Sequence, residues 1–176
     1  MTANTQERIE ALEVALNNEE QEAAFYRKHA ERTTDPLGKK MFETLAADEQ
    51  EHYQRIKALH QKLKENGKWP ETLPLTVKGT KVRDVLKSVV EAVDSSPENR
   101  TSDMEAVKIA IAFEAKGEAH YKKLREAVDD PVEKSFYEML ETMEREHRLS
   151  LEDTYEYFKD PVSWFQRMEK HGLDGA

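Results

Sequence analysis

Two glutamates and two Glu-x-x-His motifs recur at matching positions in the two halves of this chain of 176 residues. Residues 19–52 align without a gap with residues 114–147, with 13 identities in 34 positions. Each copy carries a lone glutamate, a tyrosine seven residues later and then Glu-x-x-His. The candidate metal ligands are therefore Glu19, Glu49, His52, Glu114, Glu144 and His147. A glutamate from each of two helices, plus Glu-x-x-His from each of two others, is the ligand set of a di-metal site in a four-helix bundle.

The candidate ligands fall where buried apolar residues are expected. Around each copy, apolar residues recur at steps of three and four, which predicts amphipathic helices, and the candidate ligands lie on the same stripe. Four carboxylates in one buried layer would repel one another without cations, and two divalent ions would balance their charge. Carboxylate and imidazole ligands favour iron or manganese over copper(I) or structural zinc. The sequence predicts two iron ions, with manganese as the alternative; a duplicated bundle with solvated Glu and His does not explain the buried stripe.

Other polar residues flank this set. Tyr26 and Tyr121 are expected to hydrogen-bond a ligand carboxylate, with simple core packing or a redox role as alternatives. Glu118 stands where the first copy has Ala23, one turn after Glu114, so it is a candidate extra ligand or a residue at the wet end of the bundle. No catalytic residue separate from the metal ligands is predicted. The remaining histidines are interpreted as surface residues: His29, His60, His120 and His171.

The elements that must position these residues are helices. Asn4 with Glu7, and Ser102 with Glu105, have the spacing of helix starts. Asp-Pro pairs at 35–36, 130–131 and 160–161 predict an N-cap followed by a proline in the first turn, and Asn66-Gly67 predicts a helix end. We therefore expect an all-α, antiparallel four-helix bundle with halves 5–66 and 102–160. The crossover 67–101 would contain a short helix, and a tail helix would occupy 161–176. One long crossover between the second and third helices is the ferritin-like connection.

Composition excludes several classes of protein. The net charge of −9 argues against a nucleic-acid partner. The absence of cysteine excludes disulfides, zinc fingers, iron–sulfur clusters and a Cys₄ iron site. No apolar run is long enough for a membrane span, and the N-terminus lacks a signal-peptide core, so we expect a cytoplasmic protein without membrane contact. Trp69, Trp164 and Phe165 are apolar residues that one bundle is not expected to bury, which favours a homodimer.

The stretches NNEEQEAAFYRKHAE, LAADEQEHY, IAFEAKGEAHY and MLETMEREHR resemble the rubrerythrin branch of the ferritin-like di-iron superfamily, over about residues 5–160. The resemblance implies a non-haem di-iron centre. It makes Glu19 and Glu114 terminal ligands, and Glu49 and Glu144 bridging ligands. It also implies that His52 and His147 each cap one iron. Relatives reduce hydrogen peroxide or oxidise ferrous iron, often as homodimers, and the first of these activities would be a response to oxidative stress.

The chain departs from that pattern in two ways. Rubrerythrins proper carry a rubredoxin-like domain that supplies electrons, and this chain has no cysteine for one, so an external donor, rubredoxin-like or another reductase, is expected. They also carry a glutamate three residues after the third-helix ligand, where this chain has Gly117, so Glu118 or Glu22 is a candidate replacement. The leading interpretation is a di-iron peroxidase. The alternatives are an iron-storage or ferroxidase protein, or a scaffold that retains the site without turnover.

Overall fold

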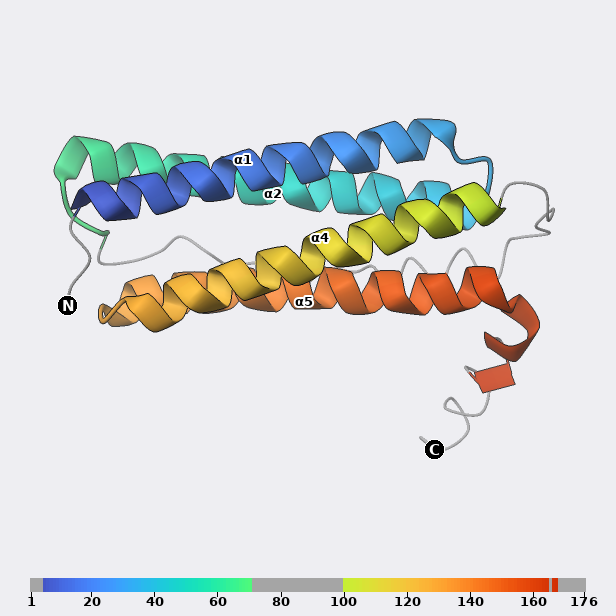
Figure 1. Ribbon diagram of the computed structural model, residues 1–176. Coiled ribbons are helices and arrows are strands. Elements are labelled where there is room, and N and C mark those ends of the chain that lie inside the picture. Colours follow the sequence, from blue (N-terminus) through green and yellow to red (C-terminus); the bar gives the residue numbers. More distant parts are fainter. Residues whose placement is uncertain (1–4, 71–99, 165, 168–176) are drawn as a thin grey trace, which may run out of the picture.

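The computed structural model describes residues 5–70, 100–164 and 166–167, and no strand occurs within these ranges. It contains the long helices α1 (Thr5–Arg32), α2 (Pro36–Asn66), α4 (Arg100–Ala127) and α5 (Pro131–Lys159). Figure 1 shows two antiparallel pairs, α1 with α2 and α4 with α5. Helix α4 is tilted relative to the other three helices. The predicted all-α, ferritin-like bundle is confirmed. The short helix predicted within 67–101 and most of the tail lie outside the described residues.

The turn inside each pair is set by its Asp-Pro sequence. The Asp35 carboxylate accepts a hydrogen bond from the Gly38 backbone N–H at 2.9 Å, and Pro36 occupies the first turn of α2. Asp130 does the same for α5, since it accepts from the backbone N–H groups of Val132 and Glu133 at 2.9 and 3.0 Å. A carboxylate at this position satisfies donors that a helix start leaves free. Both predicted starts are confirmed, and each pair is therefore a helical hairpin.

Two further predicted boundaries had different outcomes. Gly67 ends α2 as expected, with φ of 65°, a left-handed conformation that glycine adopts without a Cβ penalty. The start predicted at Ser102 is wrong because α4 already begins at Arg100. Serine is only mildly unfavourable inside a helix, so its capping pattern does not prevent the helix from extending upstream.

The apolar core is divided into two clusters by a polar layer. On α2, Leu45 belongs to the first cluster and Ile56 to the second, while Glu49 and His52 lie between them in the sequence. The first cluster also includes Tyr26, and the second includes Tyr121. Because the helices run antiparallel, the same alternation recurs on all four. The polar layer is therefore enclosed by apolar side chains toward both ends of the bundle.

Both tryptophans outside the repeat are buried by the chain itself. Trp69 is 9% exposed and packs on Phe136 and Tyr137, with ring centroids 5.7 and 6.1 Å apart. Trp164 is 2% exposed and donates a hydrogen bond to Asp153 Oδ1 at 2.9 Å. The expectation that these residues need a second chain to cover them is wrong, since the two ends of the bundle provide pockets for them. Phe165 lies outside the described residues.

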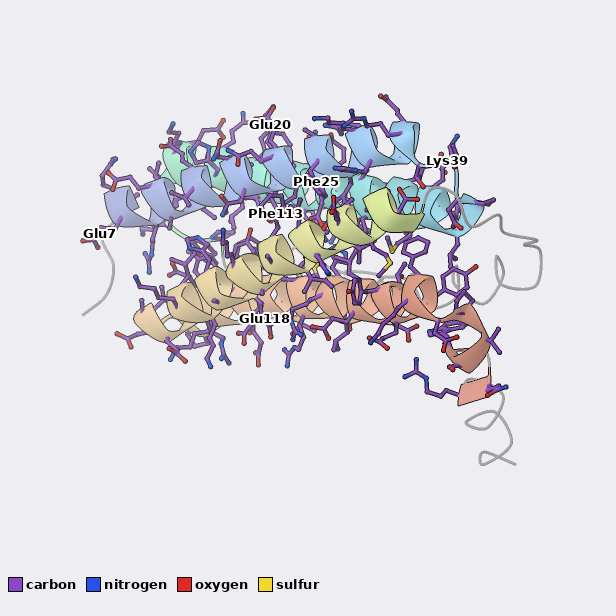
Figure 2. All side chains as sticks on the ribbon, turned by 45° about the vertical axis from the view of Figure 1, so that its right-hand side comes forward. Glu7, Glu20, Phe25, Lys39, Phe113 and Glu118 are labelled. Carbon is purple, nitrogen blue, oxygen red and sulfur yellow. The ribbon has the colours of Figure 1, made fainter. Side chains whose placement is uncertain are left out.

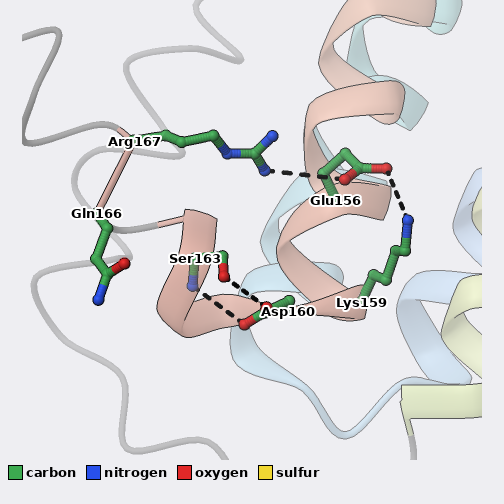
Figure 3. Close-up of a pocket in the computed structure, with 6 residues that line it drawn as sticks. All are labelled: Glu156, Lys159, Asp160, Ser163, Gln166 and Arg167. Atoms are coloured by element: carbon green, nitrogen blue, oxygen red, sulfur yellow. Dashed lines mark hydrogen bonds and ion pairs between the residues drawn. The ribbon is translucent and has the colours of Figure 1, made fainter.

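The tail begins at Asp160, which ends α5 and starts the helical turn at 161–164. The Asp160 carboxylate accepts hydrogen bonds from the Ser163 backbone N–H at 3.1 Å and from its hydroxyl at 2.6 Å (Figure 3). The predicted third Asp-Pro cap is confirmed. Among the described helices, none combines the length and the apolar character that crossing a membrane requires. The cytoplasmic location expected from the sequence stays a prediction.

Candidate metal centre

The six predicted ligands converge on the polar layer at the middle of the bundle. Glu19 comes from α1 and Glu114 from α4, while each of α2 and α5 supplies a glutamate and a histidine three residues apart: Glu49, His52, Glu144 and His147. A spacing of three residues puts both side chains on one helix face. All six are at most 1% exposed. Burial of so many ionisable groups in one layer is costly unless charges of the opposite sign accompany them.

The ligand atoms form two groups that share one residue. Atoms of Glu19, Glu49, His52 and Glu144 lie within 4.8 Å of one another, and so do atoms of Glu49, Glu114 and His147. Glu49 is common to both: its Oε2 is 2.9 Å from His52 Nδ1, and its Oε1 is 2.9 Å from His147 Nδ1. The two imidazole rings stack with centroids 5.4 Å apart. A carboxylate with one oxygen in each group has the position of a bridge between two ions.

Glu144 contributes to the first group only. Both of its carboxylate oxygens are buried, and neither has a hydrogen-bond or ion-pair partner among the described residues. Burial, followed by the charges of Glu114 and Glu19, raises the pKa of Glu144 well above its usual value. A buried carboxylate without a protein partner is an orphaned ligand, and a cation would satisfy it.

In the absence of cations, protons neutralise the cluster. Burial raises the pKa of Glu19 to about 7 against the opposing effect of His52. For His52, burial acts to lower the pKa, but the charge of Glu49 and the hydrogen bond to Glu19 raise it to about 10. Burial acts to raise the pKa of Glu49, but the charges of His147 and His52 hold it far below its usual range. Burial acts to lower the pKa of His147 as well, but the charges of Glu49 and Glu114 raise it well above its usual value, so the metal-free layer favours an ionised Glu49 between two protonated imidazoles.

The two tyrosines connect the halves of the repeat. The Tyr26 hydroxyl on α1 donates a hydrogen bond to Glu114 Oε1 on α4, and the Tyr121 hydroxyl on α4 donates to Glu19 Oε1 on α1. The sequence predicts a contact with a ligand carboxylate, and the structure shows one for each tyrosine. It adds that each contact is made to the glutamate of the opposite half.

Glu118 does not join the cluster. Its carboxylate accepts a hydrogen bond from Arg148 Nε at 2.9 Å and lies 3.8 Å from Arg145 Nε. Its side chain is 23% exposed and belongs to neither ligand group. Figure 2 labels it on α4, beside α5, from which both arginines come. The expectation that Glu118 approaches the centre is not met, because two cations on the neighbouring helix hold its carboxylate.

Glu22, the other candidate extra ligand, is 8% exposed and lies close to the cluster without joining either ligand group. Burial raises its pKa well above the usual value, and the nearby charges of Glu49 and Glu114 add to the shift. It is the first-half counterpart of Gly117, since both follow a lone ligand glutamate by three residues. The additional buried carboxylate therefore lies on α1 and not on α4.

Three further residues lie near the centre, and none of them was predicted to do so from the sequence. Asp48 Oδ2 lies 3.5 Å from His147 Nε2, on the ring nitrogen that faces away from the ligand group. A Cβ added to Gly117 would stand 2.6 Å from Glu144 Oε2, so any larger residue there would require that carboxylate to shift. His120 is half-buried, and its Nε2 has no partner among the described residues, so its interpretation as a surface residue is wrong. Of these three, only Gly117 carried a sequence signal, because a glycine inside a helix that bears a candidate ligand often marks a close approach of another group.

A pocket of about 370 Å³ opens between α1 and α4 beside the centre. Asn18, Gln21 and Glu22 line it from α1. Phe113, Lys116, Gly117 and His120 line it from α4. Figure 2 shows Phe113 next to Phe25 where α1 faces α4, and their rings meet edge to face at 5.2 Å.

A second pocket, of about 340 Å³, lies at the start of the tail (Figure 3). Its charged residues are largely paired with one another, since Glu156 lies 3.8 Å from both Lys159 and Arg167. It has no part in the candidate centre.

Comparison with protein families gives one result. A family model described as Rubrerythrin matches residues 10–155, a span that contains all six candidate ligands and both tyrosines. Neither the search of curated proteins nor the search of solved structures found a significant match.

Proposed function

The chain belongs to the rubrerythrin family, and on that premise we propose that it is a non-haem di-iron oxidoreductase that reduces hydrogen peroxide to water. The observation that supports the proposal most is the pair of buried ligand groups that share Glu49. Two ions bridged by a carboxylate can each exchange one electron with the same small substrate. A single iron that passes between its ferrous and ferric states exchanges only one electron.

The residues present fit two iron ions. Glu19, His52 and Glu144 would hold one ion, and Glu114 with His147 would hold the other. Glu49 would contact both, and we propose that Glu144, whose oxygens have no partner among the described residues, could serve as a second shared carboxylate. Oxygen and imidazole donors without thiolates suit iron or manganese. Four carboxylates balance the charge of two divalent ions, which removes the need for the protons that neutralise the metal-free layer.

When bound, two ferrous ions supply the two electrons that convert one peroxide and two protons into two waters. The protein contributes orientation, charge balance and exclusion of bulk water. The apolar clusters on both sides of the layer keep the site dry and the dielectric low. The hydroxyls of Tyr26 and Tyr121 fix the carboxylates of Glu114 and Glu19 in one orientation. Such contacts around metal ligands tune the ligands and restrict their motion.

The chain contains no redox-active cysteine. We therefore include in the proposal an external electron donor, a rubredoxin-like protein or another reductase, that restores the ferrous pair. A homodimer also belongs to the proposal, as an expectation from the family alone, because the burial of Trp69 and Trp164 within one chain removes the sequence argument for it.

The alternative is an iron-binding protein that oxidises ferrous iron and passes the product on without peroxidase turnover. One observation favours it: Glu22 is a buried carboxylate close to the ligand groups but in neither of them. A carboxylate in that position is a natural temporary ligand for an iron ion that is entering or leaving. In a storage protein, this activity would also require a large, shell-forming oligomer.

Anaerobic loading with ferrous iron, followed by one equivalent of peroxide, tests the proposal. Two ions per chain should bind, one peroxide should oxidise the pair, and the iron should stay bound and become reducible again. Glu49→Gln provides the control, since it removes the shared carboxylate while keeping side-chain volume. Failure to bind two ions per chain would overturn the di-iron assignment. Continued oxidation of added ferrous iron, with iron leaving the site, would replace the peroxidase with the ferroxidase alternative.

A further inference from the structure

The pocket between α1 and α4 straddles the axis that relates the two halves of the repeat. Its lining residues Asn18, Gln21 and Glu22 have as repeat counterparts Phe113, Lys116 and Gly117, and these line it too. A cavity whose two walls are corresponding segments of a duplicated structure must lie between the halves. The ligands Glu19 and Glu114 are counterparts in the same way, so the pocket and the centre share this axis.

The two walls differ at every counterpart position. The ligands and the tyrosines are identical in both halves, whereas the counterpart of Asn18 is Phe113, that of Gln21 is Lys116, and that of Glu22 is Gly117. His120 is the fourth residue of α4 that lines the pocket, and its repeat counterpart on α1 is Phe25. The centre thus has a symmetric set of ligands, and the pocket gives it one distinct side. A distinct side is what a site needs if a substrate is to approach in a single orientation.

Burial increases along the pocket toward the ligands. Gln21 and Lys116 are exposed, Asn18, Phe113 and His120 are half-buried, and Glu22 and Gly117 are buried. Behind Gly117 stands Glu144, whose Oε2 would be only 2.6 Å from an added Cβ. No side chain of residue 117 therefore separates the inner end of the pocket from a candidate metal ligand. The pocket therefore leads from the surface to residues that adjoin the centre, although none of the six candidate ligands lines it.

We propose that this pocket is the port through which hydrogen peroxide reaches the centre, with Glu22 and His120 as positioning residues that hydrogen-bond it on the way. The proposal rests on the proposed function for its substrate. Peroxide is small, uncharged and both a donor and an acceptor of hydrogen bonds. The lining offers it the amides of Asn18 and Gln21 and the Glu22 carboxyl group. The His120 ring also lines the pocket, and its buried Nε2 has no partner among the described residues.

The lining also selects against other species. Lys116 places a positive charge at the exposed rim, which disfavours the approach of a ferrous ion by this route. Phe113, which lines the pocket, packs edge to face against Phe25, so its bulky ring is held at the pocket wall. We therefore expect the port to admit hydrogen peroxide and nitric oxide and to hinder bulky organic hydroperoxides such as cumene hydroperoxide.

Exchange of residues between the halves provides a test with a built-in control. Asn18→Phe places the second-half residue in the first half and fills the pocket. Asn17→Phe makes the same change one residue away, at an exposed position of α1. The readout is nitric oxide binding to the di-ferrous protein, followed optically in a stopped-flow experiment. In Asn18→Phe, association and dissociation should both slow about tenfold while the dissociation constant stays the same, because a port changes rates only. Asn17→Phe should match the wild type.

The reverse exchange, Phe113→Asn, widens the pocket and covers the case in which Asn18→Phe does not fold or does not load with iron. It should raise turnover of cumene hydroperoxide relative to that of hydrogen peroxide. Unchanged nitric oxide kinetics in Asn18→Phe, or an unchanged substrate ratio in Phe113→Asn, overturns the port. If the wild type binds iron and nitric oxide but does not reduce peroxide, the proposed function fails, while a slowed Asn18→Phe still identifies the port for small neutral molecules.

Discussion

The hydroxyl of Tyr26 hydrogen-bonds Glu114, although the two residues belong to different halves of the repeat. Tyr121 and Glu19 make the reciprocal contact. Each tyrosine lies seven residues from the lone glutamate of its own helix, yet it reaches across to the other. The two hairpins are therefore joined at the centre by two buried hydrogen bonds that need no metal. Each tyrosine also determines the orientation of a candidate ligand on the opposite helix.

Tyr26→Phe should weaken metal binding without unfolding the bundle. The ring is retained, but Glu114 loses the donor that orients it, and loss of a contact of this kind typically weakens metal affinity about 10- to 100-fold. The measurement is a competitive metal titration against a chelator of known affinity. Tyr137→Phe is the control, since that tyrosine is buried in the second apolar cluster and has no contact with a ligand. Equal affinities for the two variants would contradict the orienting role.

Glu49 and Glu144 should differ in the metal-free protein, although both are needed for metal. Glu49 is the ionised partner that His52 and His147 share, so Glu49→Gln takes the nearest negative charge from both buried imidazoles and should destabilise the metal-free bundle by about 3 kcal/mol. Glu144 is partnerless and its pKa is raised, so Glu144→Gln should leave metal-free stability unchanged or slightly higher. Urea denaturation of both variants checks the order. A larger loss for Glu144→Gln would contradict the charge assignment.

The metal-free protein should lose stability as pH rises from about 5 to 8. The folded pKa of Glu19 is raised to about 7 from its usual 4.5, so its contribution to stability is complete below pH 4.5 and is lost as pH rises through 7. Because the pKa of Glu144 is also raised, this residue likewise makes the folded protein less stable as pH rises. The raised pKa of His52 also stabilises the folded protein. That contribution is complete below pH 6.5 and is lost only as pH approaches 10. Thermal denaturation at several pH values measures the trend.

Metal loading should reverse this dependence. Coordination requires His52 to give up its proton and Glu19 to be ionised, so metal uptake should release protons and metal affinity should rise with pH. Proton release in weakly buffered solution and thermal stability of the manganese-loaded protein test this together. A metal-free protein that is more stable at pH 8 than at pH 5 would contradict the proton-neutralised layer.

Glu118→Ala should leave iron content and the rate of peroxide oxidation at wild-type values. The carboxylate pairs with Arg148 and Arg145 at a partly exposed position, where such pairs contribute about 1 kcal/mol or less. Glu22→Ala is the informative comparison, because that carboxyl group lines the pocket and lies near the ligand groups. Slower oxidation in Glu118→Ala than in Glu22→Ala would restore Glu118 to the centre.

The parts of this molecule that were predictable from sequence are those encoded by local patterns. The caps at Asp35 and Asp130 depend on residues within one turn, and the buried layer follows from glutamates on an apolar stripe. Glu118 was misplaced because its position on the stripe is matched by Arg148, which is distant in sequence. The burial of Trp69 by Phe136 and of Trp164 by Tyr157 likewise depends on tertiary contacts. Neither spacing nor composition determines which of two distant residues meets which.

The division of the ligands between two helical hairpins also has a consequence for ancestry. One hairpin alone supplies Glu19, Glu49 and His52, which is half of the set, and the other hairpin supplies the equivalent half. A single ancestral hairpin with this pattern would complete a site only by pairing with a second copy of itself, at a concentration high enough for the pair to form. Fusion of the two copies in one chain replaces that encounter with an intramolecular one, at an effective concentration set by the connecting segment. Fusion also frees each half to diverge, and the unlike walls beside the centre are the product that a pair of identical subunits could not have made.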